Sequence, residues 1–125
     1  MAETDLRDKV VVIGGGGKNL GGLLATRLGE LGAKVVVHYH GDASAPDAEK
    51  TVDAVTSAGG EAVTAQGDLT RVADVRALFD TAVDSYGRVD VAVNTTGMVL
   101  RKPILETTED EYDRMFAVNA KAGYF

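Results

Sequence analysis

Residues 10 to 22 read VVVIGGGGKNLGG, an apolar run followed directly by a loop made mostly of glycine. Each glycine costs backbone entropy on folding, so this many are expected only where the chain must approach something closely. A strand, a glycine loop and a helix in succession direct free backbone N–H groups and a positive helix end toward a phosphate. A plain strand-to-helix turn is the alternative, and it needs only one or two glycines. The stretch therefore predicts a phosphate-binding loop.

The composition excludes several other classes of protein. The chain has 125 residues, of which 45% are apolar and 26% charged, as in a soluble globular protein. Its net charge of −6, without a basic block, argues against a nucleic-acid partner. It has no cysteine, and no apolar run is long enough to span a membrane. The acidic N-terminus is unlike a secretory signal, so we expect a cytoplasmic protein with one domain over residues 1–125.

Four short runs rich in β-branched and apolar residues are the predicted strands. They cover residues 9–13, 34–39, 61–66 and 89–94. The valine-rich runs are typical of strands that are buried on both faces of a parallel sheet. Because helical patterns separate the strands, the order predicts a Rossmann-type doubly wound α/β sheet.

The first two helices are predicted from apolar positions spaced three and four residues apart. The first helix ends at Gly32, and a second is expected from about Pro46 to the glycine pair at 59–60. The predicted buried stripe of the first helix consists of Leu20, Leu23, Leu24, Leu28 and Leu31.

The last two helices have clearer boundaries. The third covers residues 72–86, with Thr70 as its expected N-cap and Gly87 as its stop. Thr108 and Glu111 have capping-box spacing, which predicts that a fourth helix starts there.

The glycine loop does not match the strict nucleotide-binding motifs. A P-loop would need Ser or Thr after Lys18, where the chain has Asn19, and GxGxxG fails in every register. The pattern that nearly fits is GxxxGxG, read from Gly15 to Gly21, with Asn19 in the middle glycine position. Asparagine is a tolerable substitute for glycine where φ is positive.

Four motifs in register make the chain resemble the N-terminal half of the short-chain dehydrogenase/reductase family. Its TGxxxG[IL]G pattern is matched by residues 14–21, and its Asp-Val/Leu pair after the third strand by Asp68 and Leu69. Its NNAG turn is matched by residues 94–97, and an Asn in the following helix by Asn119. The departures are Gly14 for the family's Thr, Asn19 for Gly, and Thr95 and Thr96 within NNAG.

The resemblance implies a nicotinamide-cofactor site and a sheet of strand order 3-2-1-4. The cofactor contacts it implies are Gly15, Lys18, Asn19, Leu20, Gly21, Tyr39, His40, Asp68, Leu69, Asn94, Thr95 and Gly97.

The second strand bears on which nucleotide is preferred. An acid about 20 residues beyond the glycines binds the ribose 2′-OH and selects NAD. Tyr39 stands there, and Lys18 matches a basic residue that the family uses for a 2′-phosphate, with His40 as a further donor. NADP(H) is therefore predicted over NAD(H), although Lys18 could also be a solvated loop lysine. His38, His40 and Asp42 lack a clear further ligand, so no metal site is predicted.

The family's chemistry is hydride transfer between nicotinamide and a carbonyl or alcohol of a small molecule. A Tyr in YxxxK is its general acid/base, a Ser polarises the substrate oxygen, and an Asn holds a water of the proton relay. Of this set the chain contains only the Asn, at Asn119, and no Tyr is followed four residues later by Lys. We therefore expect the 125-residue chain to be inactive alone.

The end of the chain suggests a partner. In the order 3-2-1-4 the apolar fourth strand is an edge, which invites pairing, and residues 123–125 end a helix without a cap. We expect the front half of a longer enzyme, which forms homo-oligomers or pairs with a missing C-terminal half. The alternatives are a non-catalytic nucleotide-binding or regulatory remnant, and a methyltransferase-like domain, against which the lack of an acid at Tyr39 argues.

Overall fold

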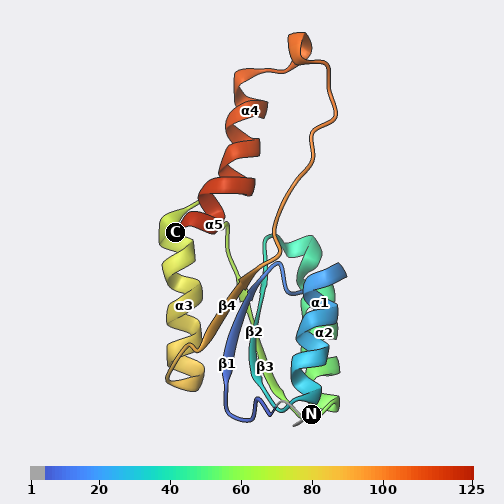
Figure 1. Cartoon of the computed structure of the whole chain (residues 1–125), viewed down its shortest axis with the longest axis vertical. Coiled ribbons are helices and arrows are strands. Elements are labelled where there is room, and N and C mark those ends of the chain that lie inside the picture. The colour runs from blue at the N-terminus through green and yellow to red at the C-terminus, as the bar shows by residue number, and fades with distance from the viewer. Residues whose placement is uncertain (1–4) are drawn as a thin grey trace.

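The computed structural model describes residues 5–125, and its centre is one parallel sheet of four strands (Figure 1). The strand order is β3-β2-β1-β4, as predicted. The strands are β1 (Val10–Gly14), β2 (Lys34–Tyr39), β3 (Glu61–Gln66) and β4 (Val91–Asn94).

The boundary of β4 differs from the prediction by two residues. Asp90 lies before the strand, and its carboxylate accepts the backbone N–H of Val10 at 2.9 Å. Residues 89 and 90 therefore connect α3 to the sheet instead of extending the strand. The register places Gly14 beside Asn94, so the carboxyl ends of β1 and β4 meet.

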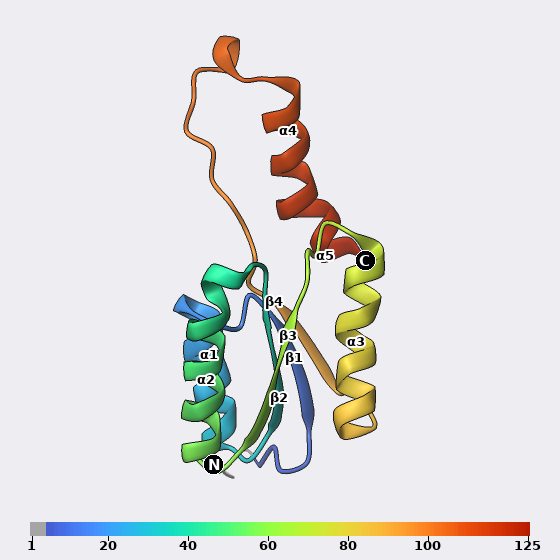
Figure 2. The ribbon, with the colours of Figure 1, turned by 180° about the vertical axis from the view of Figure 1, so that it is seen from behind.

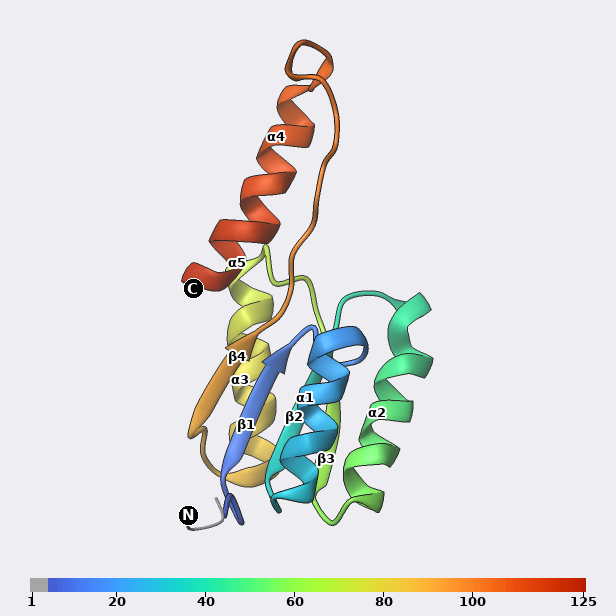
Figure 3. The ribbon, with the colours of Figure 1, turned by 45° about the vertical axis from the view of Figure 1, so that its right-hand side comes forward.

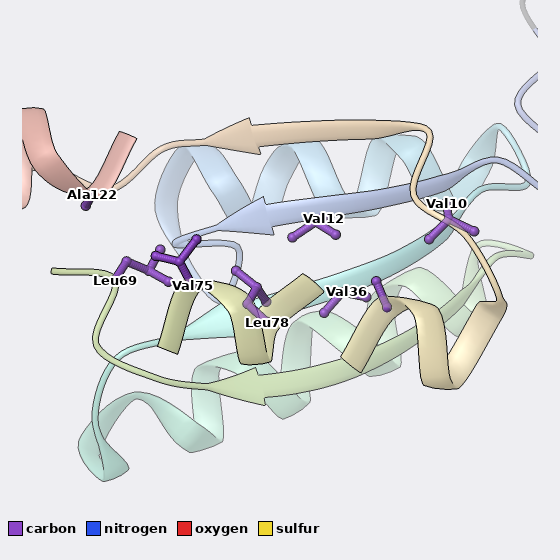
Figure 4. Packing of buried hydrophobic residues seen from close by; sticks show 8 residues of the cluster. Val10, Val12, Val36, Leu69, Val75, Leu78 and Ala122 are labelled. Carbon is purple, nitrogen blue, oxygen red and sulfur yellow. The ribbon is translucent and has the colours of Figure 1, made fainter. Parts of the chain in front are cut away.

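Helices cover both faces of the sheet (Figure 3). α1 (Asn19–Glu30) and α2 (Ala45–Ser57) lie on one face, and α3 (Val72–Tyr86) lies on the other. Alternate residues of β1 point to opposite faces. Val11 and Ile13 belong to the core under α1 and α2, whereas Val10 and Val12 pack toward α3 (Figure 4). Each core contains valines of β1 and β2, the runs that predicted the sheet, together with residues of the helices that cover that face.

The predicted leucine stripe of α1 is correct only in part, since Leu24 and Leu28 pack against the core. Leu20 and Leu23 are 69% and 70% exposed, and the helix instead buries Gly21, Gly22, Ala25 and Gly29. The cause is close packing, since a Cβ on Gly29 would lie 2.9 Å from the backbone oxygen of Val55 in α2. A leucine on that face would not fit.

The termini of the later helices correct one prediction and confirm two. Arg71, in an extended conformation, is the N-cap of α3, whereas Thr70 donates its hydroxyl to Asp68 Oδ1 at 2.6 Å. Gly87 ends α3 with φ +81°, as predicted. The capping box of Thr108 and Glu111 opens α4 (Glu109–Phe116).

The segment after β4 leaves the sheet as an extended arm (Figures 1 and 2). It contains a short turn at Ile104–Glu106 and returns through α4, the π-helical turn Ala117–Lys121 and α5 (Ala122–Tyr124). A salt bridge of 3.0 Å between Lys102 and Glu111 joins the two sides of the arm. Within residues 5–125 no helix combines the length and apolarity needed to cross a bilayer.

Candidate cofactor site

A cleft of about 440 Å³ lies at the carboxyl edge of the sheet. Its walls come from the glycine loop, the start of α1, the end of β2, the segments after β3 and β4, and the helical turns that return from the arm. In open α/β sheets the ligand crevice lies outside the carboxyl ends of the strands. The cleft is therefore where this fold would bind a ligand.

The glycine loop adopts the conformation that its motif demands. Gly15 and Asn19 have φ values of +72° and +53°. The prediction that Asn19 occupies a glycine position of positive φ is therefore confirmed. A Cβ on Gly21 would lie only 2.1 Å from the carbonyl oxygen of Gly15, so α1 starts directly against the loop.

Thr95 ties the segment after β4 to the glycine loop. Its N–H and its hydroxyl both donate to Gly14 O, at 2.9 and 2.8 Å, and the hydroxyl also lies 3.2 Å from Gly15 O. A Cβ on Gly14 would lie 2.9 Å from Asn94 Oδ1, so a threonine there would not fit this arrangement. Thr95 thus supplies a side-chain connection between β1 and the segment after β4, where Gly14 has no side chain to make one.

Substitution Thr95→Val is expected to loosen this connection. The valine keeps the branched shape and the backbone N–H but loses the hydroxyl donor. We expect a destabilisation of about 1 kcal/mol, since a typical hydrogen bond contributes that much, and a several-fold weaker affinity for the predicted NADP(H) cofactor. Urea denaturation and fluorescence titration measure the two effects. In the control Thr96→Val the lost hydroxyl contacts Asn94, not the loop, so an equal loss of affinity there would contradict the assignment.

Asp68 borders the cleft as a carboxylate. Its Oδ1 accepts the hydroxyl and the N–H of Thr70 at 2.6 and 3.0 Å. The Thr70 hydroxyl is the main reason that the pKa of Asp68 lies below its ordinary value. The backbone N–H of Asp68 donates to Asp74 Oδ2 at 2.8 Å, and this bond fixes the segment between β3 and α3.

Asn119 lies in the π-helical turn, and its side-chain amide is hydrogen-bonded to the backbone of Met98. Its Oδ1 accepts the N–H of Met98 and its Nδ2 donates to Met98 O, both at 2.9 Å. Single π-helical turns occur frequently at functional sites. Through its side chain, Asn119 therefore holds the segment that follows β4 against the returning helix.

The structure brings most of the predicted residues together. Of the predicted cofactor contacts, only Asn94 does not line the cleft, because its Oδ1 closes a turn with Thr96. Asn119, the predicted catalytic residue, is also not among the lining residues but bonds to Met98, which is. The predicted residues that line the cleft are Gly15, Lys18, Asn19, Leu20, Gly21, Tyr39, His40, Asp68, Leu69, Thr95 and Gly97.

Several lining residues were not predicted from the sequence. The most informative is His38, which is 2% exposed and hydrogen-bonded to Gly15 and to Gly67. A polar residue inside a buried valine run must find partners, and this signal could have identified it. The others are Gly17, Ser44, Thr70, Thr96, Met98, Arg114, Val118 and Ala122. Across residues 5–125 the structure shows no cluster of three His, Cys, Asp or Glu that could bind a metal.

A family model and the most similar curated proteins point to the same family. The model of the short chain dehydrogenase family matches residues 9–125. The short chain dehydrogenase claC of Passalora fulva is 40% identical over 96% of this chain and 44% of its own length. Elsinochrome reductase 1 of Elsinoe fawcettii is 40% identical over 100% of this chain and 46% of its own.

Solved structures show the same likeness. A protein of Burkholderia cenocepacia, described as a dehydrogenase with bound NADP, is 52% identical with a TM-score of 0.93, over 98% of this chain and 47% of its own. A short-chain dehydrogenase of Oenococcus oeni is 41% identical with a TM-score of 0.82, over 99% of this chain and 53% of its own. The chain thus spans about half the length of the relatives it matches. It belongs to the short-chain dehydrogenase family.

Proposed function

We propose that this chain binds NADP(H) as the cofactor-binding part of an oxidoreductase that transfers hydride between nicotinamide and a carbonyl or alcohol of a small molecule. One observation carries the proposal. The cleft joins a glycine loop and a helix N-terminus to Lys18, and Tyr39 occupies the end of β2 in place of a carboxylate.

The residues of the cleft fit the pyrophosphate of a dinucleotide. Gly15, Gly17 and Gly21 present backbone without side chains to the cleft, next to the first turn of α1. The first N–H groups of a helix have no intrahelical acceptor, and the helix end carries a partial positive charge. Both features favour a bound phosphate.

The cleft also offers groups that suit a 2′-phosphate. Lys18, His40 and Ser44 line the cleft together with Tyr39 and offer a cation and further donors. Asp42, an acid close in sequence, is not among the lining residues and accepts the side-chain amide of Gln66 at 2.8 Å. The Burkholderia cenocepacia protein that is described with bound NADP supports the same preference.

In the proposed reaction the bound nicotinamide supplies or accepts the hydride. The chain's own residues bind and orient the cofactor. The glycine loop would hold the pyrophosphate and Lys18 the 2′-phosphate, while Asp68, Leu69 and Gly97 would line the rest of the cofactor. We propose that Asn119 acts on the reaction by positioning Met98 and the adjoining Gly97. An acid that protonates the substrate oxygen would have to come from outside these 125 residues, which contain no YxxxK.

Cofactor titration tests this proposal. NADPH is expected to bind about 10- to 100-fold more tightly than NADH, because a charge-assisted hydrogen bond contributes about 1.5–3 kcal/mol. Lys18→Gln should remove most of the difference and leave NADH affinity unchanged. The chain should not oxidise NADPH with any carbonyl compound. Equal affinity for both cofactors, or turnover by the chain alone, would contradict the corresponding part of the proposal.

A further inference from the structure

We propose that the neutral imidazole of His38 is a positioning group for the glycine loop, so that protonation of this ring releases the loop and weakens cofactor binding. The identity of the ligand rests on the proposed function, NADP(H) binding. The role of His38 is argued from its hydrogen bonds to Gly15 and Gly67.

The protonation state of His38 follows from its two partners. Gly15 N lies 3.0 Å from Nδ1, and a backbone N–H can only donate. Gly67 O lies 2.8 Å from Nε2, and a carbonyl can only accept. The ring is therefore the neutral tautomer with its proton on Nε2. Both nitrogens are used, which also explains why this buried histidine is not available to a metal.

The contact acts on one peptide unit, the one between Gly14 and Gly15. Its N–H donates to His38 from β2, and its C=O accepts two hydrogen bonds from Thr95 after β4. This peptide unit directly precedes the positive φ of Gly15. The carbonyl oxygen of Gly15 is in turn the atom to which Gly21 of α1 comes closest. The side chain of His38 therefore sets the orientation of the loop from which α1 begins.

Protonation of His38 on Nδ1 would turn its hydrogen bond with the Gly15 N–H into a repulsion. A proton on Nδ1 would face the Gly15 N–H at 3.0 Å, so two donors would oppose each other. The partly buried N–H of Gly15 would lose its acceptor, which costs at least what a typical hydrogen bond contributes. We infer that the ring and the loop separate in the cationic state.

The surroundings of His38 oppose its protonation. Burial is the main reason that the pKa of the imidazole lies below its ordinary value, and His40 on the same strand acts in the same direction. Asp68, after β3, favours protonation. From the other elements, Lys18 in the glycine loop lines the same cleft, and Asp74 on α3 accepts the N–H of Asp68. Affinity is thus complete above the pKa of the ring and falls as the pH drops through it.

The experiment uses His40→Gln as background, which leaves His38 as the only histidine of the chain. NADH and NADPH affinities are measured against pH, with circular dichroism as a check that the fold persists. Below the pKa of the ring, both affinities should fall by about tenfold per pH unit, because each unit of pH is a factor of ten in the neutral fraction. In His38→Asn the amide oxygen keeps an acceptor beside Gly15 and does not titrate. Its NADH affinity should stay within a few-fold and be independent of pH, because NADH lacks the 2′-phosphate, whose own second pKa is about 6.

NMR separates failure of this inference from failure of the proposed function. The Gly15 amide proton should shift with the same midpoint as the His38 ring, whether or not a cofactor binds. If neither cofactor binds at any pH, the proposed function is wrong. If the ring titrates without moving the Gly15 amide, or if His38→Asn keeps the pH dependence of NADH binding, the positioning role is overturned.

Discussion

Gly21→Ala is expected to abolish NADPH binding by the chain. The added Cβ would lie 2.1 Å from Gly15 O, 2.8 Å from Thr95 Oγ1 and 2.9 Å from Gly15 C. Because two of these atoms are backbone, no rotamer change relieves the clash. Either α1 or the glycine loop must move, and overpacking of a close contact costs about 1–3 kcal/mol or more. We expect a loss of affinity of more than about 100-fold, since the displaced parts are the proposed phosphate site.

The neighbouring position supplies a matched control. A Cβ on Gly22 would lie 3.3 Å from its nearest neighbour, the side-chain hydroxyl of Thr51. Gly22→Ala changes the same helix by the same methyl group and improves helix propensity. It should retain affinity within a few-fold. Isothermal titration calorimetry with NADPH, and urea denaturation of each variant, make the comparison. Tight binding by Gly21→Ala would show that the close approach of α1 to the loop is not needed.

The parallel sheet could be predicted because buried parallel strands leave a strong signal in the sequence, whereas the strand order followed from the resemblance to the family. Valine runs separated by helical patterns allow few arrangements of an α/β sheet. The conformation of Asn19 could also be predicted, because few residues tolerate a positive φ. The burial of α1 could not, since periodicity reports where apolar residues lie and not how near the neighbouring backbone comes. The informative stripe was the small one of Gly22, Ala25 and Gly29, which permits close packing against α2.

The site shows the same division. The lining of the cleft follows from motifs at the carboxyl ends of strands, so most of it could be predicted. The contacts that hold the motifs together join residues that are distant in sequence, such as Thr95 with Gly14 and His38 with Gly15. No local pattern encodes these pairs. These two contacts matter because Gly14 has no side chain of its own, so the glycine loop is held in place by the side chains of His38 and Thr95.

Tyr39→Asp is expected to reverse the cofactor preference. Tyr39 lines the cleft at the end of β2, where a carboxylate would bind a ribose 2′-OH and repel a 2′-phosphate. Two like charges about 4–5 Å apart repel by about 3–4 kcal/mol at an effective dielectric constant of 20. NADPH affinity should therefore fall by about 100-fold or more, while NADH affinity should rise. Titration of both cofactors onto the variant measures the change.

Tyr39→Asn separates charge from packing. Tyr39 also packs against the core under α1 and α2, so any small replacement loses that contact. The asparagine variant loses the same packing without adding a charge, and it should keep NADPH as the tighter ligand. Repulsion by the aspartate should weaken as salt is raised, because mobile ions screen exposed charges over about 10 Å at 0.1 M. Packing loss should not depend on salt in this way. If both variants lost NADPH affinity equally at every salt concentration, the end of β2 would not be where the 2′-phosphate is discriminated.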